Sequence, residues 1–335
     1  MENKLKIAII KLSSLGDIVH CAIVLQFIKR FVPDAHISWF VDSKFAKILD
    51  FVSSIDEVIS LPLKDKNYKQ TWQILKAHRG KFDLIIDFQG LIKSAIIARM
   101  LGSSTCGFDK NSAKEGLSSI FYFKKFSCNY ARNIILRNLE LSAFALNFSF
   151  EKEDIIHKMP CFSAPAQAIK DLKQKLDKKS GEKFVLIAPF ASEKNKCYCH
   201  FDEIIKSLSK HAKCFVIAGN EEEEKTAKEL VKNLDAKLLY PLDLGQILAL
   251  FKLCDLVIGN DSGIAHLAWA QNCATITLFG NRPASRNTYD TLKNISFQAT
   301  PKNEIDARHI DKSDFCINEL EPAQIINCAL ELIHA

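Results

Sequence analysis

Residues 6–17, with the sequence KIAIIKLSSLGD, decide the fold class of this chain. A strand is predicted at Lys6–Ile10, because its apolar, β-branched part Ile7–Ile10 is typical of a buried strand, and the amphipathic stretch Ile18–Phe31 is typical of a helix. The residues between them form the tight connection expected at the start of an α/β domain. Ligands of such domains bind outside the carboxyl ends of the strands, so Asp17 is expected at a reaction site.

The same alternation continues to about residue 146. It predicts further strands at Ile37–Val41, Val58–Leu61, Leu84–Phe88 and Ser104–Gly107. It predicts further helices at Phe45–Phe51, Tyr68–His78, Leu91–Leu101 and Ala131–Leu146. Alternating strands and helices favour a parallel sheet built from right-handed βαβ units.

A polar, proline-containing stretch at residues 147–165 interrupts the pattern, and we interpret it as a linker between two domains. Beyond it the pattern predicts strands at Phe184–Ala188, Cys214–Ala218, Lys237–Leu239, Leu256–Gly259 and Thr275–Phe279. It predicts helices at Phe201–Lys210, Glu222–Lys232, Leu244–Phe251, Ile264–Gln271 and Pro322–Ile333. The prediction is two Rossmann-like domains facing across a cleft, at residues 1–155 and 165–320. A final helix within 321–335 is expected to pack back on the first domain.

Composition and charge narrow the class of protein. The chain has 335 residues, which suits two domains, and 48% of them are hydrophobic. No apolar run reaches the roughly 18 residues that span a bilayer, and the N-terminus shows no secretory pattern, so a cytoplasmic protein is expected. Residues 1–150 carry 21 Lys and Arg against 13 Asp and Glu. That excess predicts an anionic partner on the N-terminal side, although a solvated surface with a chance imbalance remains open.

The cysteines do not point to a metal or a disulfide framework. There are 11 of them, scattered and often within apolar segments, as expected of small hydrophobic residues in a reducing compartment. The run Cys197–His200 lacks a second pair of ligands at zinc-site spacing. We therefore expect no metal and no cofactor.

A second strong signal is the turn Gly259–His266, GNDSGIAH, which follows a buried-type strand and opens a helix. Asp261 is suited to cap that helix, and Gly263 lets a ligand approach the backbone. The free N–H groups of a helix N-terminus favour an anion, and His266 lies one turn further on. A simple capped helix with a packed histidine remains an equal alternative.

Other candidates follow strands in the same way. Ser192 and Lys196 come after Phe184–Ala188 and could hold phosphate oxygens, while Glu223 belongs to an acidic run that could contact ribose hydroxyls. The chain has neither a G-x-G-x-x-G nor a G-x-x-x-x-G-K-[ST] motif, which argues against a nicotinamide oxidoreductase and a P-loop ATPase.

Three motifs, KLSSLGDIVH (11–20), DFQGLIKSA (87–95) and the turn at 261–267, together resemble the lipopolysaccharide heptosyltransferases. The likeness runs from Lys4 to about Phe279. It implies an α/β GT-B fold and inverting, metal-independent transfer of heptose from ADP-heptose to a Kdo sugar of Kdo-lipid A. It also implies a monomer at the anionic cytosolic face of the inner membrane, with no nucleic acid as partner.

The resemblance assigns roles to individual residues. Asp17 matches the catalytic base of the family, and Lys196 matches its diphosphate-binding lysine, with a role in catalysis. The donor-binding set is Ser192, Lys196, Glu223, Leu242, Asp261, Ser262, Gly263 and His266. The acceptor-binding set is Ser14, Gly16 and Gln89, with the cations Lys64, Lys66, Lys69, Lys114 and Arg137 as candidates. Paired threonines of the family are replaced here by Ala191-Ser192, and its aromatic–proline pair by Tyr198-Cys199.

Two other functions stay open at this point. One is a family member that acts later in core synthesis, with the same donor and a different acceptor. The other is a catalytically inactive protein that only binds a nucleotide-sugar. A nucleotide-sugar epimerase fits the pattern poorly.

Overall fold

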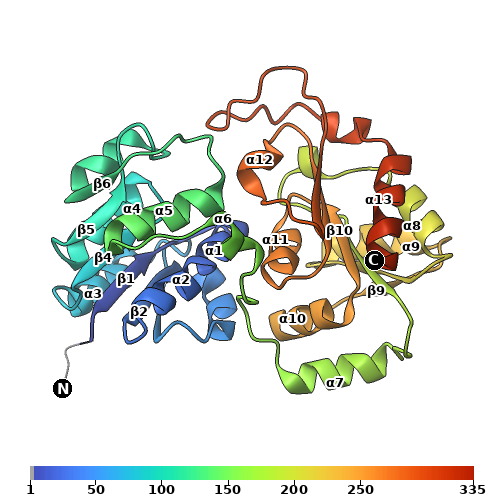
Figure 1. Ribbon diagram of the computed structural model, residues 1–335, viewed down its shortest axis with the longest axis horizontal. Helices are drawn as coiled ribbons and strands as arrows, with labels where there is room; N and C mark the ends of the chain where they lie inside the picture. The colour runs from blue at the N-terminus through green and yellow to red at the C-terminus, as the bar shows by residue number, and fades with distance from the viewer. Residues whose placement is uncertain (1–3) are drawn as a thin grey trace. The chain divides into compact units, whose positions relative to one another are not determined.

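The computed structural model describes residues 4–335 and divides them into two compact units (Figure 1). The first unit ends at Cys161 and the second begins at Phe162. None of the helices described in this range is long and apolar enough to cross a membrane.

The first unit is built on a six-stranded, wholly parallel sheet in the order β3-β2-β1-β4-β5-β6. Its strands are β1 (Lys6–Ile10), β2 (His36–Asp42), β3 (Glu57–Leu61), β4 (Leu84–Asp87), β5 (Thr105–Phe108) and β6 (Lys124–Phe126). Ile10 of the central strand β1 pairs with Phe40 on one side and Asp87 on the other. The loops that leave β1 and β4 therefore start side by side.

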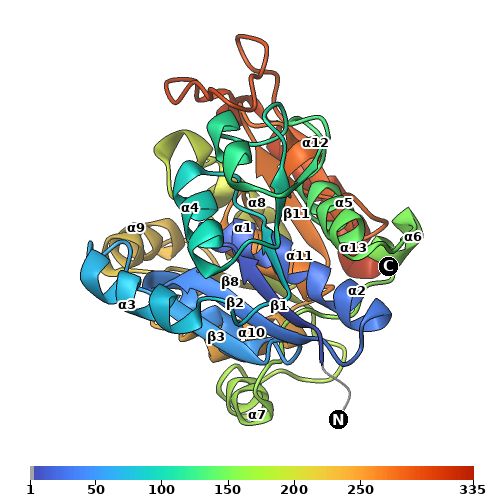
Figure 2. The same cartoon turned by 90° about the vertical axis from the view of Figure 1, so that its left-hand side faces the viewer.

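Helices cover both faces of this sheet. They are α1 (Leu15–Ala22), α2 (Val24–Phe31), α3 (Tyr68–His78), α4 (Ile92–Leu101), α5 (Ile134–Leu146) and α6 (Lys152–Ile156), with 3-10 helices η1 (Ser43–Phe51) and η2 (Gly116–Phe121). Leu75 of α3 and Ile97 of α4 share one apolar cluster with Ile10. Because side chains alternate along a strand, Ile9 points to the opposite face, where α1, α2 and α5 contact one another. Figure 2 shows α3 and α4 side by side on their face.

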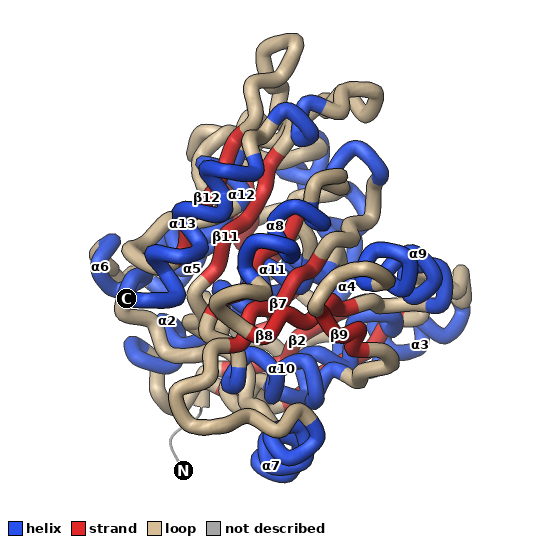
Figure 3. Tube along the Cα trace, turned by 90° about the vertical axis from the view of Figure 1, so that its right-hand side faces the viewer, coloured by secondary structure: helices blue, strands red, loops and turns tan. Residues whose placement is uncertain are grey.

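The second unit repeats this plan with the strand order β12-β11-β10-β7-β8-β9, again parallel throughout (Figure 3). Its strands are β7 (Phe184–Ala188), β8 (Lys213–Ile217), β9 (Ala236–Leu239), β10 (Leu256–Asn260), β11 (Thr275–Phe279) and β12 (Asn294–Gln298). Its helices are α7 (Ala166–Lys175), α8 (Phe201–Leu208), α9 (Glu221–Val231), α10 (Leu244–Leu253), α11 (Gly263–Ala270), α12 (Ala284–Asn287) and α13 (Pro322–His334), with 3-10 helices η3 (Lys194–Lys196) and η4 (Cys316–Glu319).

The last helix, α13, packs within the second unit. Its apolar stripe of Ile325, Ala329 and Ile333 is fully buried and joins the same core as Phe201 of α8. The spacing of these apolar residues matches the face of α8 on which the helix packs. The expectation that this helix packs back on the N-terminal domain stays a prediction.

The predicted fold class is confirmed, since each unit is a parallel sheet covered by helices. The predicted helix at Ile18–Phe31 is in fact two helices that meet at Ile23, and the one at Phe45–Phe51 is the 3-10 helix η1. The edge strands β6 and β12 and the helix α7 were not predicted.

Candidate functional site

Asp17 lies in the first turn of α1, directly beyond the carboxyl end of β1. Its Oδ2 accepts hydrogen bonds from the backbone N–H of Ser14 at 3.2 Å and from the Ser14 hydroxyl at 2.9 Å. Its Oδ1 lies 3.6 Å from Nζ of Lys11, which is buried at the end of β1 and also donates to the carbonyl of Phe88. The Asp17 side chain keeps 41% of its surface exposed, so a substrate hydroxyl can reach the carboxylate.

The surroundings hold Asp17 in its ionised form. Burial raises its pKa, but the positive charge of Lys11 and the hydrogen bonds from Ser14 outweigh burial and lower the pKa to about 2. The carboxylate is therefore available as a proton acceptor over the whole physiological pH range. Because the folded-state pKa is depressed, the stability from this pairing is present above the unfolded pKa of about 3.9 and is lost as pH falls toward 2.

Lys11→Met tests which group sets this pKa. We expect the pKa of Asp17 to rise in the variant, because the buried cation is lost while the unbranched side chain still fills the core. Carboxyl-carbon NMR titration of Asp17 measures the change directly. Lys6→Met, at an exposed position at the start of β1, is the matched control and should leave the titration unchanged. Equal titration curves for the two variants would show that Lys11 does not control the carboxylate.

Gln89 holds the loop that follows β1 in place. The Oε1 atom of Gln89 accepts the backbone N–H of Leu12 at 3.0 Å and of Ser13 at 3.3 Å, which fixes the start of the loop that carries Asp17. The structure thus gives Gln89 a positioning contact in addition to the acceptor role that the resemblance predicts.

Asp87 is completely buried at the end of β4. Its Oδ2 accepts the Tyr122 hydroxyl at 2.7 Å, and its Oδ1 accepts the backbone N–H of Gln89 at 2.8 Å. Burial raises the pKa of Asp87 despite these bonds. The ring of Tyr122 fits there only because residue 107 is glycine, where a Cβ would lie 2.5 Å from the ring. Asp87 is therefore a structural group below the site.

The predicted acceptor cations fall into two groups. Lys64 and Lys66 are exposed in the loop between β3 and α3, and Lys114 is exposed between β5 and η2. The Nζ atom of Lys64 lies 4.5 Å from the centre of the Phe45 ring. These loops follow parallel strands, as the loop with Asp17 does, so all of them lie along the carboxyl edge of the sheet.

Arg137 differs from these lysines and is a correction to the predicted acceptor set. It is 2% exposed, and its guanidinium donates to the carbonyls of Ser112 at 2.7 Å and Asn129 at 2.9 Å. The group also lies 4.6 Å from the Phe108 ring. Arg137 lies on the buried side of α5 and connects the loops that contain Ser112 and Asn129. The two carbonyls provide the hydrogen bonds that a buried charge needs.

In the second unit, two of the predicted donor residues, Lys196 and His266, meet at the buried carboxylate of Asp261. Its Oδ2 accepts Nζ of Lys196 at 2.6 Å, and its Oδ1 lies 2.9 Å from Nε2 of His266. Burial raises the pKa of Asp261, but the bond from His266 and the charge of Lys196 outweigh burial and hold the pKa well below its usual range. Lys196 and Asp261 are 65 residues apart in the sequence and meet because β7 and β10 are neighbours.

The N-terminus of α11 lies against the same lysine. Ser262, rather than Asp261, is the N-cap residue, and its side chain makes no capping bond, so the predicted capping role of Asp261 is wrong. The Oγ atom of Ser262 is buried and has no hydrogen-bond partner among residues 4–335. Nζ of Lys196 also approaches the carbonyl of Asp261 at 3.3 Å, one residue before this cap. A lysine, an unused hydroxyl and the N–H groups that open at Gly263 together suit a phosphate oxygen.

The remaining predicted donor residues lie on other loops of this unit. The carboxylate of Glu223, in the first turn of α9, accepts the backbone N–H of Gly219 at 2.7 Å. Ser192 is exposed in the loop after β7, and Leu242 is half-buried just before α10. Each of these loops follows the carboxyl end of a strand, but the hydrogen bonds of Lys196 go to Asp261 and to none of these three residues.

Two functional candidates were missed by the sequence analysis. The buried amide of Asn260 donates to the carbonyl of Pro189 at 2.7 Å and accepts the N–H of Tyr198 at 3.1 Å, which ties the Lys196 loop to the end of β10. Arg282, just beyond β11, pairs with Glu193 of the Lys196 loop at 3.0 Å. Asn260 is the last residue of β10 and Arg282 follows β11, and these positions at the carboxyl ends of strands were the available signal.

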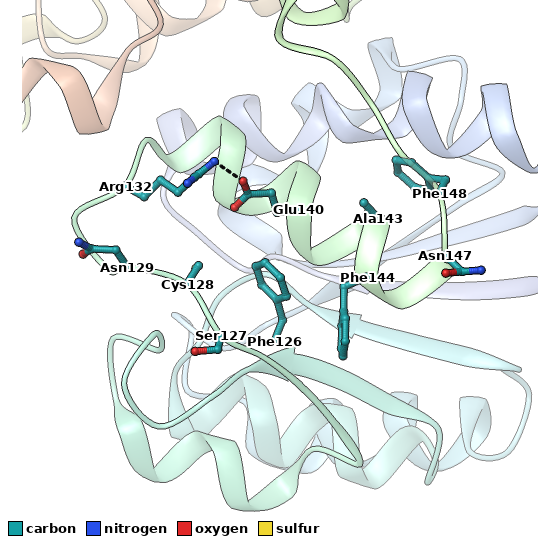
Figure 4. Close-up of a pocket in the computed structure, with 10 residues that line it drawn as sticks. All are labelled: Phe126, Ser127, Cys128, Asn129, Arg132, Glu140, Ala143, Phe144, Asn147 and Phe148. Carbon is teal, nitrogen blue, oxygen red and sulfur yellow. Dashed lines mark ion pairs between the residues drawn. The ribbon is translucent and has the colours of Figure 1, made fainter.

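A separate pocket of about 550 Å³ lies in the first unit, beside β6 and α5 (Figure 4). An ion pair between Arg132 and Glu140 lines it, together with aromatic rings such as Phe126 and Phe144. It contains none of the predicted site residues. Among residues 4–335, no group of three or more His, Cys, Asp or Glu side chains is arranged to hold a metal ion.

Comparison with known proteins gives a consistent result. Residues 71–308 match the model of glycosyltransferase family 9 (heptosyltransferase). The chain is 40% identical to lipopolysaccharide heptosyltransferase 1 of Campylobacter coli, over 98% of this chain and 99% of that protein. Among solved structures it resembles the E. coli heptosyltransferase WaaC with ADP, at a TM-score of 0.77 and 21% identity over 98% of this chain and 100% of that one. It also resembles E. coli ADP-heptose lps heptosyltransferase II, at a TM-score of 0.72 and 15% identity over 98% of this chain and 99% of that one.

Proposed function

Since this chain belongs to glycosyltransferase family 9, we propose that it transfers heptose from ADP-heptose to a Kdo residue of Kdo-lipid A, with inversion at the anomeric carbon. The observation that carries this proposal is the cluster of half-buried Lys196 with buried Asp261 and His266, beside the unused hydroxyl of Ser262 at the start of α11. The name of the Campylobacter coli relative and the ADP-2-deoxy-2-fluoro heptose in one WaaC structure support the choice of donor.

On the donor side, Lys196 and the α11 N-terminus hold the diphosphate. When the bond between the anomeric carbon and the diphosphate oxygen breaks, its electron pair leaves with ADP. The departing oxygen gains negative charge, which the ammonium of Lys196 and the N–H groups beyond Ser262 stabilise. Asp261 is a positioning residue here, because it fixes the lysine through a 2.6 Å bond.

On the acceptor side, Asp17 takes the proton of the attacking Kdo hydroxyl. A carboxylate with a pKa of about 2 is a weak base toward a free alcohol. The alcohol oxygen becomes strongly acidic once it bonds to an anomeric carbon of oxocarbenium character, and a weak base then suffices. Attack on the face opposite the diphosphate inverts the configuration.

Product analysis tests the proposed reaction. Purified protein is incubated with ADP-heptose and Kdo-lipid A, and products are weighed by mass spectrometry. We expect one added heptose and one released ADP per acceptor. Transfer only to an acceptor that already carries heptose would identify a later core transferase instead. ADP-heptose binding without any product would indicate an inactive binding protein.

Reversing charge at Lys64 and Lys66 tests the acceptor side. The acceptor carries carboxylates, so we expect Lys64→Glu/Lys66→Glu to raise the KM for Kdo-lipid A by at least about tenfold, since like charges replace attraction. The KM for ADP-heptose should not change. Lys170→Glu/Lys173→Glu, on exposed positions of α7, is the matched control. A change in donor kinetics alone would contradict the assignment.

We further propose that the protein acts as a monomer at the cytosolic face of the inner membrane. The lipid chains of the acceptor lie in that membrane, and the basic first unit suits its anionic surface. Light scattering of the purified protein measures its mass in solution and so tests whether it is a monomer.

A further inference from the structure

The helices α3 and α4, the 3-10 helix η2 and the residue before β6 expose large apolar side chains. They are Tyr68 (63% exposed), Trp72 (59%), Ile96 (42%), Leu117 (64%), Ile120 (69%) and Phe123 (80%). The helices α3 and α4 contact each other, as do α4 and η2, so these side chains come from adjoining elements, called here the α3–η2 face (Figure 2). Apolar side chains clustered on adjoining elements mark an interaction surface more often than scattered ones do.

The 3-10 helix η2 buries its polar side chains and exposes two of its apolar ones, although apolar side chains are normally the buried ones. Its sequence is GLSSIF, and the two serines, Ser118 and Ser119, are buried while Leu117 and Ile120 point outward. Residues i and i+3 lie one above the other in a 3-10 helix, so Leu117 and Ile120 form a single apolar ridge. Phe123 extends the apolar surface just beyond it.

The charges on this face are positive except for that of Glu115, the N-cap residue of η2, whose carboxylate accepts the backbone N–H of Ile92 at 2.7 Å. The helices α3 and α4 and the 3-10 helix η2 contain no Asp or Glu. They carry Lys69 and Lys76 on α3, and Lys93 and Arg99 on α4, all exposed. Lys93 and Arg99 lie three residues before and after the exposed Ile96, so cations flank the apolar side chain on the same side of α4. Aromatic and aliphatic side chains among lysines are typical of a surface that meets anionic lipid headgroups.

We propose that the α3–η2 face docks on an anionic membrane, with Trp72 and the ridge of Leu117 and Ile120 entering the headgroup region. This inference rests on the proposed function and specifies which surface meets the membrane. The loop with Lys64 and Lys66 leads directly into α3, so docking brings the acceptor lysines to the lipid surface. The acceptor then reaches them while its acyl chains stay in the bilayer.

Trp72 provides a direct probe of docking. The chain has three tryptophans, and the other two, Trp39 and Trp269, are buried. We expect vesicles of phosphatidylethanolamine and phosphatidylglycerol to shift the fluorescence of the protein to shorter wavelength, whereas phosphatidylcholine vesicles leave it unchanged. The shift should be lost in Trp72→Phe, which keeps an apolar ring. No shift with anionic vesicles would overturn the proposal.

Flotation with the same vesicles measures affinity. Leu117→Ser/Ile120→Ser/Phe123→Ser should lower the partition coefficient by at least about tenfold. Lys76→Gln/Lys93→Gln should lower it by on the order of 20-fold, because each cation near the surface contributes about fivefold. The matched controls are Leu292→Ser, at a site 98% exposed in the second unit, and Lys170→Gln/Lys173→Gln on α7. Equal flotation of test and control variants would contradict the proposal.

Two further readouts distinguish membrane docking from catalysis and from self-association. Vesicle binding needs no catalysis, so a protein that floats but transfers no heptose would contradict only the proposed function. Transfer to a delipidated Kdo acceptor should be the same in all variants of the α3–η2 face and in the wild-type protein. A different result would be that light scattering shows the wild-type protein to be a dimer and Leu117→Ser/Ile120→Ser/Phe123→Ser to be a monomer. In that case the face binds a second copy of the chain and the membrane proposal is wrong.

Discussion

Asp17→Asn is expected to lower kcat by about 10²–10⁴, the range typical for loss of a general base. The amide keeps an oxygen that can accept the hydrogen bonds from Ser14, so the start of α1 should be preserved. ADP affinity should not change, because the proposed donor residues belong to the second unit. Steady-state kinetics with Kdo-lipid A, combined with calorimetric titration of ADP, measures both quantities.

Asp34→Asn is the matched control for this variant. Asp34 is exposed in the loop between α2 and β2, at the amino end of the strands, and its substitution should leave kcat unchanged. An active Asp17→Asn variant would remove Asp17 as the base. A loss of ADP affinity together with kcat would show that the substitution disturbs the protein more widely.

The second large effect is expected from Lys196→Ala. Removal of one group that stabilises developing charge typically costs about 10²–10³ in rate, and we expect this loss in kcat/KM for ADP-heptose together with weaker ADP binding. The variant also leaves the buried carboxylate of Asp261 with the His266 ring but without its lysine. Breaking a buried ion pair costs about 3–5 kcal/mol, so the melting temperature should fall as well.

Kinetics of Lys196→Ala therefore have to be measured at a temperature where the variant is folded. Lys194→Ala is the control, since Lys194 is exposed in the same 3-10 helix η3. Unchanged ADP affinity in folded Lys196→Ala would reject the lysine as a diphosphate ligand. A lower melting temperature alone, with normal kinetics, would reduce its role to holding Asp261.

The central strands could be predicted from sequence almost to the residue. β1, β7 and β11 match their predicted ranges because each is an apolar run buried on both faces. The edge strands β6 and β12 lack that pattern. β6 is the three-residue segment KKF, and β12 alternates polar and apolar residues as NISFQ, so neither forms an apolar run.

Some features of the candidate site could likewise be predicted from the sequence, and others could not. The loops with Asp17 and Asp261 were predictable because each follows a buried strand. The bond between Lys196 and Asp261 was not, since it depends on β7 lying beside β10. The buried position of Arg137 did have a signal. It lies three residues after Ile134 and four before Leu141, on the apolar side of α5.

The contact of Gly107, Tyr122 and Asp87 has a consequence for how this protein can evolve. A side chain at position 107 would collide with the Tyr122 ring, and a smaller residue at 122 would remove the hydroxyl bonded to the Asp87 carboxylate. A replacement at position 107 thus leaves a steric clash, and one at position 122 leaves Oδ2 of the buried Asp87 carboxylate without its hydrogen-bond donor. A combined change of all three residues avoids both defects. We therefore expect these three positions, which span 35 residues of the chain, to change together or not at all during evolution.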